Sequence, residues 1–169
     1  MIYGENTWNE AKAWVSDGNS FALMGDGTNA FIYKFYVNNL EAKNCYRISS
    51  SVATDVLSAD FYAFSSTRSV LFYVKNNTLY AYNYDIGNER VDMIPLDTTD
   101  EITMLKFDLQ ADGTYNDLYV ATYNSATGGT LQKYTLGTDQ NTFELKPDER
   151  CCWTGLVKVK DMDWRNSTK

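Results

Sequence analysis

The chain contains no histidine among its 169 residues. This excludes Ser-His-Asp and Cys-His catalysis within the chain, histidine metal ligation and a histidine-based pH switch. There are only three cysteines, Cys45, Cys151 and Cys152, and an odd count in so long a chain does not build a disulfide framework. The adjacent pair also lacks the C-x-x-C spacing of a zinc site. We expect plain thiols, with a bridge from Cys45 to one of the other two as the alternative.

Long apolar runs and an excess of basic residues are absent as well. No apolar run approaches the roughly 18 residues that a membrane-spanning helix needs. The opening segment MIYGENTWNEAKAW has neither a basic start nor an apolar centre, so we expect no signal peptide in it. The net charge of −7 argues against nucleic acid and anionic membranes as partners, because both bind basic surfaces. No Walker loop and no G-x-G-x-x-G motif is present, so we expect no phosphate cradle.

The residues that are abundant favour β-strands. Hydrophobic residues make up 44% of the chain, which indicates a folded domain rather than a disordered chain. Short aromatic and β-branched runs alternate with small or polar residues, as in TLYAYNYD, where Leu79, Tyr82 and Tyr84 are the large positions. No long stretch keeps the 3.6-residue period of a helix. The sequence therefore predicts an all-β fold.

One unit recurs three times along the chain. A first strand type occurs as FALMGDG, VLFYVKN and LYVATYN, beginning at Phe21, Val70 and Leu118. After a turn rich in glycine or asparagine comes a second type, AFIYKFYV, TLYAYNYD and TLQKYTLG, beginning at Ala30, Thr78 and Thr130. Such turn residues tolerate the positive φ of tight hairpins. The third type is CYRISS, RVDMIPLD and TFELKPDE, and the fourth is DFYAFSS, EITMLKFD and LVKVKDMDW, with an earlier copy at AKAWVSD.

Four short antiparallel strands repeating every 40–50 residues are typical of β-propeller blades. We predict one domain over residues 1–169, a β-propeller-like arc of about three four-stranded blades at 11–50, 60–98 and 101–149, with a closing strand at 155–164. Propellers have about four to eight blades, so we expect this chain to be the C-terminal part of a longer propeller. The alternatives are an open arc that pairs with a second copy through its edge strands, and a β-sandwich or barrel.

The C-terminal segment CCWTGLVKVKDMDWRN, together with the blade rhythm, resembles the C-terminal propeller region of PKD-like lipoproteins from gut Bacteroidetes. In that family a blade of this kind is followed by a closing strand with a Trp/Gly-x-x-Lys-Val pattern, here Trp153, Gly155, Lys158 and Val159. The resemblance covers residues 11–164. It implies a cell-envelope protein from a nutrient-uptake locus, and it implies no catalytic residue.

The stretch FDLQADGTYNDL has the spacing of an acidic calcium loop. Asp108, Gln110, Asp112, Gly113 and Asn116 occupy positions 1, 3, 5, 6 and 9 of a D-x-[DN]-x-[DN]-G pattern. Alternating oxygen ligands and a glycine at the sharp bend are what calcium requires. Glutamine stands at position 3, however, and no glutamate at position 12. The alternative is a long hairpin with Asp-Gly at its turn and no cofactor.

The four tryptophans divide into two predicted roles. Trp8 and Trp164 are the candidates for exposed contacts that stack on sugar rings, because Trp8 lies outside any clear strand and Trp164 lies near the chain end. For Trp14 and Trp153 we expect packing between blades, because propeller blades stack face to face and aromatic side chains bury large areas.

These observations favour a non-enzymatic binding or interaction module with a carbohydrate or peptide ligand. A structural module that self-assembles into a homo-oligomer through open edge strands is one alternative. Another is a fragment of a propeller hydrolase, with Asp161 and Asp163 on one face of the closing strand and its remaining catalytic residues elsewhere. The chain has no histidine and no catalytic motif that would support an enzymatic function, so we expect a binding function.

Overall fold

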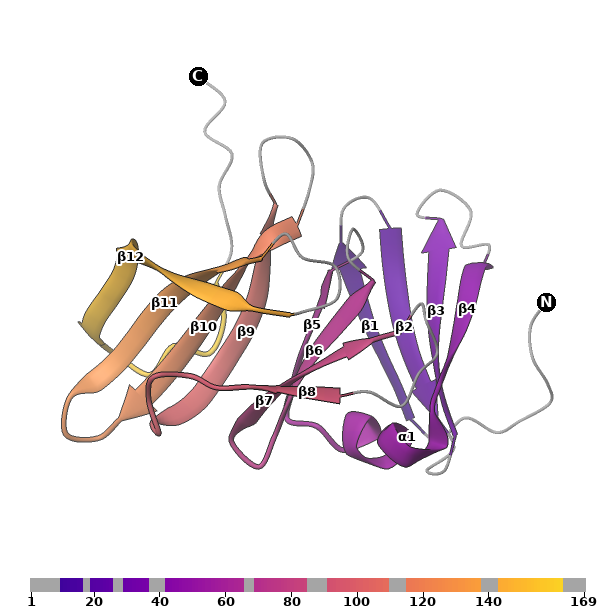
Figure 1. Ribbon diagram of the computed structural model, residues 1–169, viewed down its shortest axis with the longest axis horizontal. Helices are drawn as coiled ribbons and strands as arrows, with labels where there is room; N and C mark the ends of the chain where they lie inside the picture. The colour runs from indigo at the N-terminus through magenta and orange to yellow at the C-terminus, as the bar shows by residue number, and fades with distance from the viewer. Residues whose placement is uncertain are drawn as a thin grey trace, which may run out of the picture.

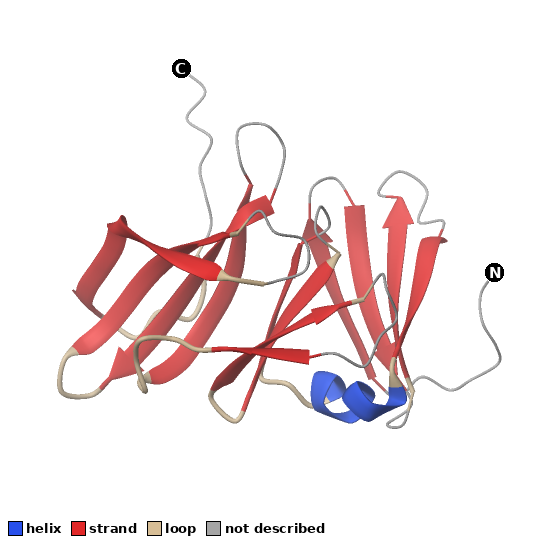
Figure 2. Ribbon diagram, viewed as in Figure 1, coloured by secondary structure: helices blue, strands red, loops and turns tan. Residues whose placement is uncertain are grey.

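The computed structural model describes residues 10–16, 19–25, 29–36, 42–65, 69–84, 91–109, 115–137 and 143–162. These residues form three four-stranded antiparallel sheets and one short helix, so the predicted all-β class is confirmed (Figure 1, Figure 2). Each sheet is a meander in which strands adjacent in sequence pair with one another. Within the described ranges, no helix has the length and apolar character that crossing a bilayer requires.

Sheet 1 comprises β1 (Glu10–Ser16), β2 (Asn19–Gly25), β3 (Ala30–Tyr36) and β4 (Ala42–Ile48). Sheet 2 comprises β5 (Phe61–Ser65), β6 (Val70–Lys75), β7 (Thr78–Asn83) and β8 (Val91–Ile94). Sheet 3 comprises β9 (Glu101–Leu109), β10 (Tyr115–Asn124), β11 (Gly128–Leu136) and β12 (Leu145–Leu156). The predicted starts of the first two strand types fall at the first residue of the observed strands or inside them, whereas the run DFYAFSS begins one residue before β5.

Two hairpin turns show how local chemistry sets the register. The β6–β7 turn is Asn76-Asn77, with φ of 49° and 57°, the left-handed conformation that a two-residue hairpin requires and asparagine tolerates. Its ladder runs from Lys75 opposite Thr78 to Val70 opposite Asn83. In the β10–β11 hairpin, Gly128 supplies the positive φ of 87°.

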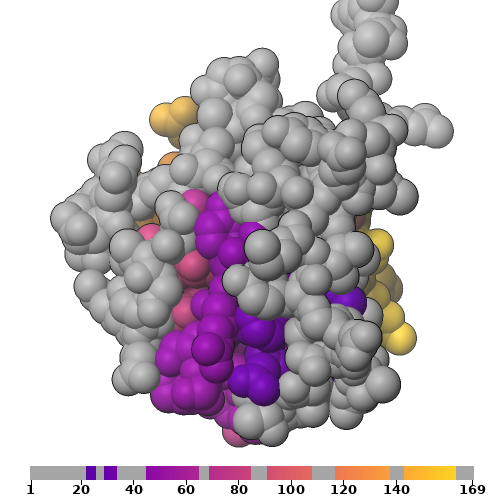
Figure 3. All heavy atoms as spheres, turned by 90° about the vertical axis from the view of Figure 1, so that its right-hand side faces the viewer, coloured from indigo at the N-terminus to yellow at the C-terminus, as the bar shows by residue number. Residues whose placement is uncertain are grey.

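A short helix, α1 (Ser50–Leu57), which the sequence analysis did not predict, joins β4 to β5. Val52, Ala53, Val56 and Leu57 are buried, so one face of the helix covers the end of sheet 1. A Cβ on Gly25 in β2 would lie 2.5 Å from the Leu57 side chain, which shows how closely the helix packs there. Figure 3 shows the purple segment that includes α1 lying directly against indigo residues of sheet 1.

The three sheets stack in chain order, and sheet 2 is buried on both faces (Figure 1). One apolar cluster joins sheet 1 and α1 to one face of sheet 2, with Leu23, Ile32, Val56 and Tyr82 among its members. A second cluster joins the other face of sheet 2 to sheet 3 and centres on Phe72, whose ring lies 5.6 Å from that of Phe107 and 6.5 Å from that of Phe143. Because both faces of sheet 2 are covered, β6 is a continuous apolar run rather than an alternating one.

A third, smaller cluster lies on the outer face of sheet 3. Met104, Tyr119 and Ala121 are buried there beneath Val159 and Met162, which belong to the extended segment that follows β12. The predicted closing strand at 155–164 differs from this arrangement, because its first two residues complete β12 and residues 157–162 form no strand. The third predicted unit likewise ends too early at 149, since β12 continues to Leu156 past a register irregularity.

Candidate functional site

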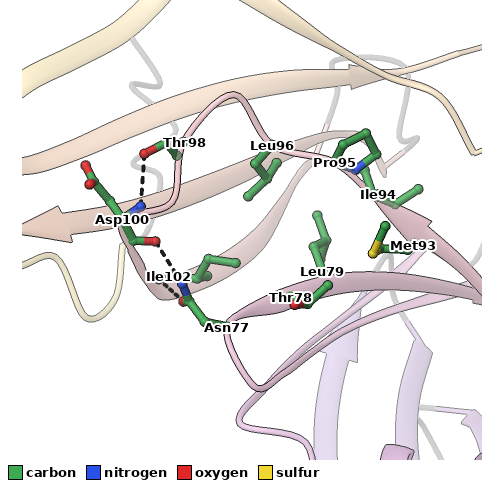
Figure 4. Close-up of a pocket in the computed structure, with 10 residues that line it drawn as sticks. All are labelled: Asn77, Thr78, Leu79, Met93, Ile94, Pro95, Leu96, Thr98, Asp100 and Ile102. Carbon is green, nitrogen blue, oxygen red and sulfur yellow. Dashed lines mark hydrogen bonds between the residues drawn. The ribbon is translucent and has the colours of Figure 1, made fainter.

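A pocket of about 160 Å³ opens where β8 ends and the chain crosses to sheet 3 (Figure 4). Ile94 is the last β8 residue, paired with Leu79, and Pro95 follows it. Proline has no backbone N–H to donate to the ladder, so the chain leaves β7 at this point. The connection to β9 then passes over the start of β7, and the pocket lies between them. Its lining residues are Asn77, Thr78, Leu79, Met93, Ile94, Pro95, Leu96, Thr98, Asp100 and Ile102.

One end of the pocket is held by hydrogen bonds that converge on Asn77 and Asp100. The Asn77 Nδ2 donates to the Asp100 carbonyl oxygen at 3.1 Å, and its Oδ1 accepts from the Ile102 backbone N–H at 2.7 Å. The Asp100 backbone N–H donates to Thr98 Oγ1 at 3.1 Å. Asn124 Nδ2 from sheet 3 donates to Asp100 Oδ1 at 2.9 Å. This network fixes the β8–β9 connection against the β6–β7 turn.

Apolar side chains form the buried part of the pocket wall, and polar groups form about half of the surface that the pocket exposes. Leu79, Ile94 and Ile102 are buried members of the second cluster, and Leu96 packs against it partly buried. Figure 4 shows Leu79, Leu96 and Ile102 in the space between the connection and β7. Met93 stands at the rim and is 63% exposed. Asp100 is the one ionisable residue among those that line the pocket, and Thr78 and Thr98 add hydroxyl groups to the lining.

The strand and the connection that form one side of the pocket are rich in acidic residues. The segment from Val91 to Glu101 contains four carboxylates and no lysine or arginine; they are Asp92, Asp97, Asp100 and Glu101. Lys158 from the C-terminal segment neutralises Glu101, with its Nζ 2.8 Å and 2.9 Å from the two carboxylate oxygens. The charge of Asp97 also reaches Tyr134 in β11 of sheet 3. Burial is the main cause that raises the pKa of Tyr134, and the negative charge of Asp97 raises it further.

A separate ion cluster holds the strands of sheet 3 together. Lys133 Nζ lies 3.3 Å from Asp117 Oδ2 and 3.4 Å from Asp148 Oδ2, and Thr135 Oγ1 donates to Asp117 Oδ1 at 3.0 Å. Burial acts to lower the pKa of Lys133, but Asp117 and more weakly Asp148 outweigh it and raise that pKa. The backbone N–H of Arg150 first, and then Lys133, lower the pKa of Asp148. These contacts join β10, β11 and β12 across sheet 3.

The predicted calcium loop is only partly within the described residues. Gln110, Asp112 and Gly113 lie outside them, whereas Asp108 lies in β9 opposite Asp117, and Asn116 lies in β10. The strands on either side pair as a hairpin, with Tyr115 opposite Leu109. In the part of the chain that the structure describes, no three histidine, cysteine, aspartate or glutamate residues are grouped to hold a metal ion. The calcium site therefore stays a prediction.

The other predicted site residues are dispersed. Trp8, Trp164 and Asp163 fall outside the described residues. The prediction that Trp153 packs between sheets is wrong, because its side chain is 45% exposed opposite Leu131 on the outer face of sheet 3. No described sheet covers that part of the face. Asp161 is exposed and pairs with Lys106 at 3.3 Å.

The three cysteines are free thiols, and burial raises the pKa of Cys45. None of them lines the pocket. The pocket residues themselves were not identified from sequence, since only Pro95 after a strand and the Asn-Asn turn mark the place locally. Compared with protein-family models and with curated protein sequences, the chain matches none.

Proposed function

We propose that this protein is a non-enzymatic binding module and that the pocket between sheets 2 and 3 holds an apolar group of its ligand. The observation that carries the proposal is the pocket itself, which combines buried leucine and isoleucine side chains with polar groups held by hydrogen bonds. Ligand sites are mostly apolar concave surfaces with a few fixed polar groups, and they are usually formed before binding.

The volume limits what the pocket accepts. Pockets for whole drug-sized ligands measure about 300–1,000 Å³, whereas an apolar cavity of roughly 150 Å³ binds benzene. At about 160 Å³ this pocket accommodates one aromatic ring or one branched side chain. The ligand therefore inserts a single group, and the rest of it lies on the surface.

We further propose that the three sheets are consecutive blades of a propeller-like arc. The sheets stack in chain order, and a separate apolar core lies on each face of sheet 2, whereas a two-sheet sandwich has a single core. The first strands of sheets 2 and 3, β5 and β9, also contact each other, as the innermost strands of neighbouring blades do. Placement in a bacterial cell envelope rests on the resemblance of residues 11–164 to the propeller region of PKD-like lipoproteins. Surface labelling of intact cells that carry the native protein tests that location.

Calorimetric titration with p-cresol tests the binding function. We expect saturable binding to the wild-type chain and none to Leu96→Trp, because the larger side chain fills the pocket. Val157→Trp is the matched control, since Val157 is 84% exposed and lies outside the pocket. Equal binding by all three chains, or none by the wild type, contradicts the proposal.

A self-assembling structural module is the second candidate, and one observation favours it. Trp153 and Val157 are large apolar residues exposed beside the third cluster, where a further sheet from a second copy would bury them. Light scattering on a sizing column tests this, with Trp153→Ser as the disrupting variant. A wild-type mass of 19.3 kDa, that of one chain, contradicts self-assembly.

A further inference from the structure

The six residues that follow β12 fold back over the outer face of sheet 3. We call this segment, residues 157–162, the C-terminal strap. Val159 and Met162 of the strap cover the third cluster and are themselves only partly buried. The strap belongs to no strand, so no ladder of backbone hydrogen bonds ties it to the sheet in the part of the chain that the structure describes. Its side chains and a few polar contacts hold it in place.

Two ion pairs anchor the strap to β9. Lys158 Nζ lies 2.8 Å and 2.9 Å from the two carboxylate oxygens of Glu101. The same cation lies 5.4 Å from the ring centre of Tyr123 in β10. Lys106 Nζ lies 3.3 Å from Asp161 Oδ1 and also donates to the carbonyl oxygen of the next strap residue. Sheet 3 therefore presents one anion and one cation, and the strap presents the matching cation and anion.

The strap is joined to β12 through a glycine that serves as a hinge. Gly155 has a φ of 68°, and a Cβ built on it would have no described atom within 4 Å beyond its chain neighbours. Glycine adopts either sign of φ, so the chain can turn here without strain. Opening at this residue breaks one ladder pair, Leu156 opposite Gly129. The ion pairs that close the strap are partly exposed, and such pairs contribute little each, so the strap opens more easily than the strands.

Two large apolar residues lie on either side of the hinge and are exposed. Trp153 precedes Gly155 in β12, and Val157 is the first residue of the strap. If two chains exchange straps, the two hinge segments run past each other, and these side chains meet those of the partner. Removing this apolar surface from water favours the exchanged form over the closed chain.

We propose that two copies of this chain exchange their straps, so that residues 157–162 of each copy cover sheet 3 of the other. Exchange of an identical element keeps the contacts that the strap makes in the closed chain, which makes it a low-cost route to a dimer. The inference goes beyond the binding function, because the residues of the two ion pairs are not among those that line the pocket. It also differs from the stacking of a further sheet on Trp153, because here the charges of the strap decide which chains pair.

The test mixes two full-length variants with reversed charges. The face variant carries Glu101→Lys with Lys106→Glu, and the strap variant carries Lys158→Glu with Asp161→Lys. Each variant reverses one anion and one cation, so both keep the net charge of −7. In either variant alone, both ion pairs become pairs of like charges, within a chain and between identical chains. In the mixture, each strap meets opposite charges only on the other variant.

Native mass spectrometry identifies the species, with the strap variant labelled with ¹⁵N so that the two chains differ in mass. We expect a one-to-one dimer of the two variants, at least tenfold more abundant than either dimer of like chains. A chain with all four substitutions is the matched control, because it restores opposite charges within one chain. It should behave as the wild type does. The four side chains are 33–82% exposed, so the fold tolerates the reversals, and far-UV circular dichroism checks this.

The remaining outcomes contradict strap exchange. A mixture of folded variants that contains only single chains overturns it, because the complementary charges then bring no second copy to sheet 3. Dimers of like and unlike chains in statistical proportions overturn it as well, since the dimer then forms without regard to the straps. Either result leaves the pocket and its p-cresol test unaffected.

Discussion

Asn77 provides the sharpest test of how the pocket is built, because Asn76 beside it is a matched control. Both residues have positive φ, 49° and 57°, and both side chains are exposed. Asn77 alone of the two connects the turn to the β8–β9 connection, through Asp100 and Ile102. We therefore compare Asn77→Gly with Asn76→Gly. Glycine adopts positive φ without strain, and its added freedom in the unfolded chain is the same at both positions.

The expected difference follows from the two hydrogen bonds. Each contributes about 0.5–1.5 kcal/mol, and the bond to Ile102 leaves a largely buried N–H unsatisfied when it is lost. Asn77→Gly should therefore lower the free energy of unfolding by about 1–3 kcal/mol more than Asn76→Gly does. Asn77→Ala should cost roughly 1 kcal/mol beyond Asn77→Gly, because alanine resists positive φ.

Urea denaturation followed by far-UV circular dichroism measures these differences. The free energy of unfolding of each of the three variants is compared with that of the wild type. The comparison requires that the dependence of this free energy on urea concentration has the same slope in all four proteins. If the two glycine variants unfold within about 0.5 kcal/mol of each other, the hydrogen bonds of Asn77 do not hold the connection. The pocket would then need another explanation.

Three further predictions concern the core, the ion cluster and the outer face of sheet 3. Phe72→Ala should lower the free energy of unfolding by about 3–5 kcal/mol in urea, because Phe72 is fully buried between sheets 2 and 3; a loss below about 1 kcal/mol would show that these sheets do not share a core. The lowered pKa of Asp148 means that its contacts stabilise the fold above its ordinary value of 3.8 and are lost as pH falls through the lowered value. Carbon NMR should place its titration midpoint below 3.8, and a midpoint at or above 3.8 counts against the contacts with Arg150 and Lys133. Gly129→Ala should displace the segment after β12, because its Cβ would lie 2.2 Å from the Val157 carbonyl oxygen, whereas Gly137→Ala, with its nearest neighbour at 3.3 Å, should not; hydrogen exchange at Val159 distinguishes the two.

The hairpins were predictable because their determinants are local. The Asn-Asn turn and the flanking alternation place Val70 and Thr78 at strand starts, and the structure begins β6 and β7 at those residues. Sheet order followed from the same short turns, since adjacent strands joined by tight turns pair with each other.

The helix was missed because its sequence favours helix weakly. The segment SSVATDVL contains two valines and a threonine, which have low helix propensity, and it is only eight residues long. Burial of Val52 and Val56 against the sheets stabilises it, and that contact is tertiary. The pocket was missed for a similar reason. It depends on Asn77 meeting Asp100 and Ile102 across more than twenty residues, and no local pattern specifies that meeting.

The length of β12 also escaped sequence analysis. Pro147 and Gly155 both indicate an early strand end, yet the strand spans Leu145–Leu156. It tolerates the proline because it is the edge of sheet 3 and its register shifts opposite Gln132 and Tyr134. The Gln132 side chain supports the irregular stretch by donating to the carbonyl oxygens of Asp148 at 2.9 Å and Cys151 at 3.4 Å.

Methyl NMR during titration with p-cresol tests the central claim, a ligand pocket between sheets 2 and 3, most directly. Leu79, Ile94 and Ile102 line the pocket, whereas Leu23 and Ile32 lie in the cluster between sheets 1 and 2 and serve as internal controls. We predict saturable shifts at the first three residues and none at the last two. Shifts of equal size in both clusters, or no shift at the pocket residues, would contradict the account.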